Sequence, residues 1–135
     1  MKIKVLLFAC VAAGATTVRT YAHHSFAMYD AGRTMTLEGT VSEFQWTNPH
    51  AWIILQVSSR NGQQTQWSIQ LNGSGGLARQ GWRPKTLTPG MPIAITIHPL
   101  RDGTSGGQFL TLTLPDGTQV GASPREVPDK TAQER

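Results

Sequence analysis

The 135-residue chain is poor in the features that would cross-link it or anchor it in a membrane. Its single cysteine, Cys10, lies in an apolar N-terminal stretch, so the rest of the chain has no thiol for a disulfide or a thiolate metal site. No apolar run reaches the roughly 20 residues of a membrane-spanning helix. These absences predict a protein without a membrane span and without covalent staples.

The N-terminus has the three parts of a secretory signal peptide. Met1–Lys4 is basic, Val5–Gly14 is apolar or small throughout, and small residues precede a cleavage point after Ala22. Removal of residues 1–22 takes three basic residues away and leaves nine basic against eight acidic ones, a net charge of +1. An exported chain that is nearly neutral is a poor candidate for binding nucleic acid, which requires a basic surface.

The remaining residues are enough for one domain, expected over residues 23–122, followed by a disordered tail of Pro and charged residues over 123–135. Alternating or continuous apolar runs bounded by turn residues predict strands. The expected strands are Thr34–Phe44, Ala51–Val57, Gln64–Leu71, Pro92–His98 and Gln108–Leu114. Gly39 suggests a bulge or bend within the first of them.

Between the third and fourth strands the alternation stops, and a short helix is expected around Leu77–Gln80, capped at its start and ended by Gly81. Three strands, a helix and two strands is the order of the OB-fold, a five-stranded Greek-key barrel. The sequence therefore predicts an all-β, OB-like barrel with Leu77 and Trp82 facing the core. A small open β-sandwich is the alternative, because strand order does not prove closure.

The loop between the first two strands carries the densest group of unusual residues. Trp46, Asn48, Pro49, His50 and Trp52 fall within seven positions. Proline presets its own backbone angle and asparagine caps the backbone of a turn, so His50 should be held in one place. The loop is therefore a candidate site.

Four histidines remain after cleavage and form the candidate metal site: His23, His24, His50 and His98. Cleavage after Ala22 would make His23 the first residue, and its amine and imidazole are nitrogen donors of the kind that copper(II) favours. The ordinary alternatives are that the pair at the terminus is a solvated arm and that His50 bonds a neighbouring carbonyl. Met28 could add a thioether to copper(I), whereas Met35 should pack in the core.

Aromatic and polar residues near the loops form a second candidate site, for an organic ligand or a protein partner. It comprises Trp46, the tryptophan expected to be most exposed, together with Asn48 and Arg101. Arg101 beside Asp102 can equally be turn chemistry. No nucleophile, zinc-protease or phosphate-binding motif is present, and no catalytic residue is assigned.

The motifs AHHSF (residues 22–26), WTNPH (46–50) and HPLRDG (98–103) resemble those of a family of small exported proteins from Gram-negative bacteria, catalogued only as a domain of unknown function. The resemblance covers roughly residues 23–121. It implies a periplasmic address and brings no activity or ligand. Family members tend to carry an acidic residue where this chain has Gln70.

Taken together, these features predict a periplasmic, non-catalytic binding protein that holds copper or another transition metal through clustered histidines. The alternative is an accessory module that binds a protein partner or a small organic ligand through exposed aromatic loops, namely Trp46, Trp52 and the loop Arg101–Gly107, with the histidines structural.

Overall fold

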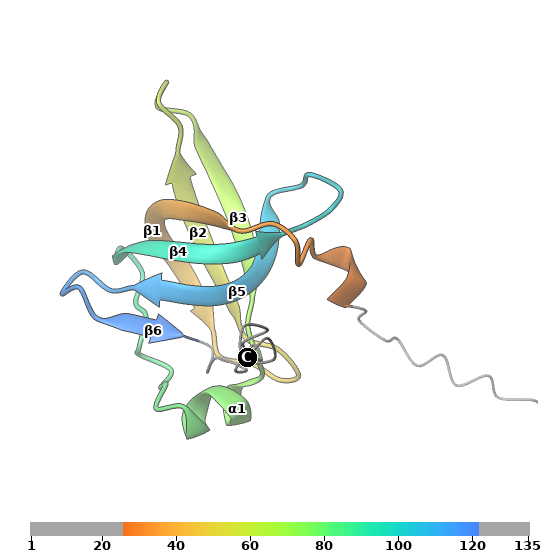
Figure 1. Ribbon diagram of the computed structural model, residues 1–135. Helices are drawn as coiled ribbons and strands as arrows, with labels where there is room; N and C mark the ends of the chain where they lie inside the picture. The colour runs from red at the N-terminus through yellow and green to blue at the C-terminus, as the bar shows by residue number, and fades with distance from the viewer. Residues whose placement is uncertain (1–25, 122–135) are drawn as a thin grey trace, which may run out of the picture.

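The computed structural model describes residues 26–121, which fold into a β-barrel with one short helix (Figure 1). The elements are the 3₁₀ helix η1 (Phe26–Met28), β1 (Met35–Gln45), β2 (Trp52–Ser58), β3 (Gln64–Gln70), α1 (Ser74–Arg79), β4 (Pro92–Pro99), β5 (Gly106–Thr113) and β6 (Gln119–Gly121). The expected signal peptide and C-terminal tail lie outside the described residues. Neither helix within residues 26–121 is long and apolar enough to cross a membrane.

The sheet closes on itself. Its strand order is β3-β2-β1-β4-β5-β6, and a parallel pairing of β3 with β5 over Ser68–Gln70 and Gly106–Gln108 joins the two sides. The prediction of a closed five-stranded, OB-like barrel with a helix between the third and fourth strands is confirmed. The open sandwich is excluded. The sequence did not predict β6, which has three residues and pairs with the end of β5.

The core fills the barrel with the inward-facing residues of the strands. Five of them, Ile53, Leu55, Ile69, Ile95 and Ile97, have no exposed surface. Both Leu77 and Trp82 are buried as predicted, and the Trp82 ring packs edge-on against Phe109 with centroids 5.6 Å apart.

Two local predictions were wrong. The bulge in β1 was predicted at Gly39 but lies between Val41 and Glu43. Gly39 instead allows β2 to approach closely, because a Cβ at this position would overlap the carbonyl of Gln56. The helix begins earlier than expected, and its N-cap is Gly73, which offers no side chain to cap it. Its end is as predicted, with Gly81 at φ +91°.

Candidate functional site

Three outward-facing side chains form a row across neighbouring strands near the loop between β1 and β2. Gln45 lies opposite Trp52, and Trp52 lies opposite Gln70. Their sequence neighbours Ile53 and Ile69 fill the core, so strand alternation turns the row to the outer face. The indole of Trp52 therefore has a carboxamide side chain on either side.

The loop of residues 46–51 is tied to the chain that follows β3. The Thr47 hydroxyl donates to the His50 carbonyl at 2.7 Å, and the Ser74 backbone N–H donates to the Thr47 carbonyl at 3.1 Å. Farther along, the Leu71 N–H donates to the carbonyl of Ala51 at 2.9 Å. The Asn48–Pro49 peptide bond is cis. These bonds fix the loop, as the sequence predicts.

The ring of His50 is fixed by a backbone contact. Its Nδ1 lies 3.2 Å from the carbonyl oxygen of Leu71. A carbonyl can only accept, so Nδ1 carries the hydrogen and the lone pair of the neutral ring is on Nε2. Metal-binding histidines are commonly oriented through the other ring nitrogen in this way.

A segment from the N-terminal side of the domain, residues 26–30, lies beside the end of β4. The Asp30 N–H donates to the Pro99 carbonyl at 2.8 Å, and the Arg101 N–H donates to the Met28 carbonyl at 3.0 Å. The Arg101 Nε donates to the carbonyl of Ala27 at 3.0 Å. This N-terminal segment (residues 26–30) is thus anchored by backbone bonds before β1 begins.

A buried polar pair joins the N-terminal segment to β3. Tyr29 and Gln70 are 4% and 7% exposed, and the Tyr29 hydroxyl donates to Oε1 of Gln70. Burial raises the pKa of the Tyr29 phenol above its ordinary value, so the hydroxyl stays protonated at neutral pH. The bond fixes the carboxamide of Gln70 with its oxygen toward Tyr29.

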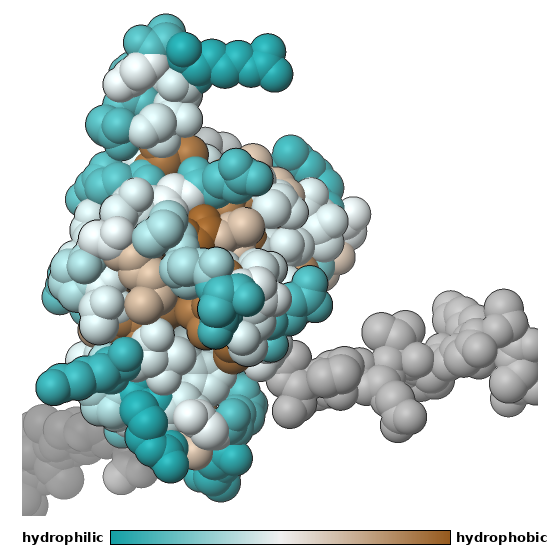
Figure 2. All heavy atoms as spheres, turned by 90° about the vertical axis from the view of Figure 1, so that its left-hand side faces the viewer, coloured by the Kyte–Doolittle hydropathy of each residue, from teal (hydrophilic) through white to brown (hydrophobic). Residues whose placement is uncertain are grey.

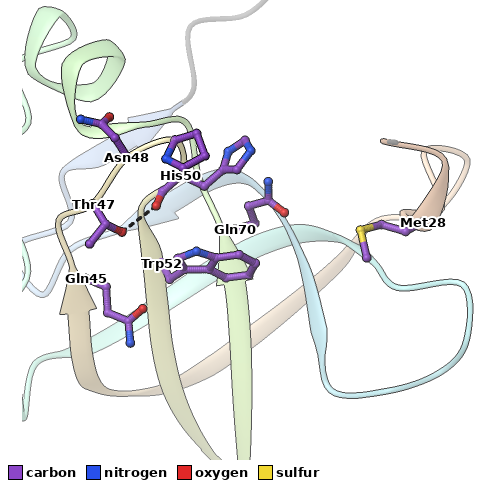
Figure 3. A pocket seen from close by; sticks show the side chains of 8 residues that line it. Met28, Gln45, Thr47, Asn48, His50, Trp52 and Gln70 are labelled. Carbon is purple, nitrogen blue, oxygen red and sulfur yellow. Dashed lines mark hydrogen bonds between the residues drawn. The ribbon is translucent and has the colours of Figure 1, made fainter. Parts of the chain in front are cut away.

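The row of three side chains, the loop of residues 46–51 and the N-terminal segment line an open pocket of about 380 Å³ (Figure 3). The side chains that line it are Met28, Gln45, Thr47, Asn48, Pro49, His50, Trp52 and Gln70. Figure 3 shows the His50 imidazole and the Gln70 carboxamide on the same side of the Trp52 indole. No Asp, Glu, Lys or Arg belongs to this lining. The pocket lining therefore contains one ionisable side chain, that of His50.

The pocket lies on a surface with few large apolar side chains. Within residues 27–121, the exposed large hydrophobic residue is Met28, at 47%. The face in Figure 2 likewise shows hydrophobic areas interrupted by polar side chains. Met35 packs against the core as predicted.

The structure brings together most of the candidate loop. Asn48 and His50 line the pocket, as do their loop neighbours Pro49 and Trp52. By contrast, His98 does not line it, and its Nδ1 is 2.7 Å from the Arg33 carbonyl. Residues 26–121 contain no group of three or more His, Cys, Asp or Glu side chains that could hold a metal ion. The other two expected ligands, His23 and His24, lie outside the described residues.

The remaining predicted residues have other contacts. Trp46 is half-buried and packs against the core and Phe44, with ring centroids 5.7 Å apart; that it is the most exposed tryptophan stays a prediction. Arg101 is exposed but holds the N-terminal segment, and its Nη1 is 3.9 Å from Asp30. Neither residue lines the pocket. The interpretation of Asp102 as turn chemistry agrees with its bonds from Thr104 at 3.0 and 2.7 Å.

Sequence reasoning missed Gln45 and Gln70 as site residues and did not place Met28 at the pocket. The available signal was strand alternation, which puts Gln45, Trp52 and Gln70 on the outer face once the register is known. The contact of Tyr29 with Gln70 spans 41 positions and has no local signal.

Comparison with known proteins gives a family and no activity. The family model described as "Family of unknown function (DUF6152)" matches residues 10–109. No curated protein and no solved structure matches the chain.

Proposed function

Because the chain belongs to this family of unknown function, we propose its role from the pocket: a periplasmic, non-catalytic binding protein that holds its ligand beside loop 46–51. The proposal rests on one observation, that separate segments of the chain meet at this pocket. Three strands, a fixed loop and the N-terminal segment all contribute side chains to one pocket. Concave sites with an aromatic surface and a few fixed polar groups are where proteins bind small molecules.

The lining favours a small, uncharged organic ligand. Burying a charged group without a partner of opposite charge is costly, and the pocket lining contains no acidic or basic side chain apart from His50. The carboxamides of Gln45, Asn48 and Gln70 can each donate and accept hydrogen bonds. A purely apolar ligand would leave these groups unpaired.

A crystal soak with a fragment library of neutral, anionic and cationic compounds tests this proposal. We expect neutral fragments to occupy the pocket and to lose binding in Trp52→Leu, as measured by ligand-observed NMR. Gln66→Ala is the matched control, since Gln66 is exposed on β3 and does not line the pocket. Fragments that bind only elsewhere, or equally well to Trp52→Leu, would refute the proposed site.

Copper is the second candidate ligand, and the position of the N-terminal segment favours it. His24 precedes Met28 by four residues, and an extended chain covers up to about 3.5 Å per residue, so either histidine of the predicted mature N-terminus is within roughly 14–18 Å of Met28. His50 lines the same pocket as Met28. Imidazole nitrogens suit copper(II), and a thioether suits copper(I).

Titration of the processed, periplasm-derived protein with copper(II) tests the second candidate. His50→Ala should weaken binding about tenfold or more, and His98→Ala should leave it unchanged. The control is closely matched, because His98 is also bound through Nδ1 to a backbone carbonyl. Equal losses in both variants, or affinity no tighter than that of a two-histidine peptide, would rule out this copper site.

A further inference from the structure

The proposed ligand pocket contains a row of three side chains that narrows the class of ligand further than the lack of charge does. Gln45, Trp52 and Gln70 are directly opposite one another on three adjacent strands. Strands lie about 4.8 Å apart, so the two carboxamide side chains begin roughly 9–10 Å apart with the indole between them. This spacing suits a flat, ring-sized molecule with polar groups on its rim.

One of these carboxamides is held in a defined orientation. Gln70 is 93% buried, and its Oε1 accepts the hydrogen of the Tyr29 hydroxyl. The N–H groups of the carboxamide are therefore the part of Gln70 that a ligand in the pocket can meet. A fixed donor of this kind selects an acceptor oxygen on the ligand.

The aromatic surface adds a second requirement. Trp52 is half-buried on the outer face of β2, beneath His50 and Gln70 in the view of Figure 3. The face of an indole carries partial negative charge, which attracts weakly positive C–H groups. The ligand should thus have a face of C–H groups and a rim of oxygens.

We infer that the pocket binds one ring of a neutral sugar, stacked on Trp52 and bonded through its hydroxyl groups to Gln70 and Gln45. Hydroxyl groups both donate and accept, as carboxamides do. The inference rests on the proposed function, because it names the ligand class of that same pocket. A volume of about 380 Å³ is at the lower end for ligand sites and agrees with a bound part as small as one sugar ring.

Titration of the full processed protein with maltose, cellobiose and di-N-acetylchitobiose, followed by ¹H–¹⁵N NMR, tests this inference. At least one of these sugars should shift the Trp52 indole signal and the Gln45 and Gln70 carboxamide signals. Glucuronate and glucosamine, which add a charge, and cyclohexanol, which lacks the other hydroxyls, should bind at least tenfold more weakly.

Substitutions make the test specific to the row. Trp52→Leu should abolish the shifts, and Trp52→Phe should restore part of the affinity because it keeps an aromatic face. Replacing the carboxamide in Gln70→Met should weaken binding about threefold to tenfold, the usual effect of one hydrogen bond. Gln66→Ala should change nothing. Thermal unfolding of each variant shows whether it remains folded. If Gln70→Met does not fold, Gln45→Met removes a carboxamide of the same row at a half-buried position and replaces it in the test.

The outcomes separate this inference from the proposed function. If fragments or copper occupy the pocket and none of the three sugars shifts its signals, the sugar inference is overturned and the proposed function stands. If neither sugars nor any other probe binds there, both fall. Sugar binding that survives Trp52→Leu also overturns the inference.

Discussion

Two corners of the barrel look alike in sequence and differ in role. The corner at residues 46–51 and the corner at residues 98–103 each hold a histidine next to a proline: His50 lies in the loop before β2, and His98 lies at the end of β4. In both, Nδ1 of the histidine is bound to a backbone carbonyl, that of Leu71 for His50 and that of Arg33 for His98. Only His50 lines the pocket. The same side-chain chemistry thus forms the wall of a site in one corner and a structural contact in the other.

A glycine packs against each corner, and these two positions should give the largest effects. At Gly107, a Cβ would lie 2.7 Å from the His98 carbonyl oxygen. Gly107→Ala should therefore lower the free energy of unfolding by about 3 kcal/mol, because the nearest atoms include fixed backbone of β4. Urea unfolding measures the loss. A variant as stable as the parent would show that β4 and β5 separate easily, contrary to the packing described.

Gly73→Ala makes the same change at the other corner. The added Cβ would lie 2.6 Å from both the Asn48 Oδ1 and the Pro49 carbonyl oxygen. We expect a smaller loss of about 1–2 kcal/mol, since a loop can shift more readily than a strand. NMR shifts of the His50 and Trp52 side chains should reveal a disturbed pocket. Gly75→Ala is the control, because its Cβ meets nothing nearer than 3.9 Å and should not reduce stability.

The two histidines allow the most direct comparison of the corners. His50→Ala and His98→Ala should each lower the free energy of unfolding by about 1 kcal/mol, since each removes one hydrogen bond to a backbone carbonyl. Ligand binding should change only in His50→Ala. Parallel chemical denaturation and binding titrations measure the two effects. A loss of binding in His98→Ala would mean that the second corner also belongs to the site.

The fold could be predicted because its signals are local. Alternation marked five strands, and Gly62, Gly81 and Gly90, all at positive φ, marked turns and the helix end. β6 escaped because three residues are too few to show a period. The bulge was misplaced because a glycine in a strand can serve either a bulge or a close approach, and Gly39 serves the second.

The candidate site could be predicted only in part, because its composition depends on which segments cross the outer face. Local turn chemistry was enough to single out Asn48 and His50. Nothing local distinguishes His98 from His50, since the carbonyl that engages His98 comes from a residue 65 positions away. The same holds for Gln70, which is recognisable as a buried polar residue only once Tyr29 is placed over it.

The smallest expected effect concerns acid stability at the second corner. Two hydrogen bonds from Thr104, first that of its hydroxyl and then that of its backbone N–H, lower the pKa of Asp102 in the fold. A pKa lowered by folding contributes stability above the unfolded value, near 4, and this contribution is lost as the pH falls through the folded value. Asp102→Asn should therefore make unfolding less dependent on pH below about 4.

Asp116, in the turn between β5 and β6, provides the matched control for that measurement. Its pKa is lowered by bonds from Thr118, and no part of the pocket is near it in sequence. If the pocket is independent of both turns, Asp102→Asn and Asp116→Asn should each reduce the pH dependence of unfolding below about pH 4, and ligand binding at pH 7 should match the parent in both. Weaker binding in Asp102→Asn alone would connect the second corner to the pocket through the N-terminal segment, which Arg101 anchors one residue away.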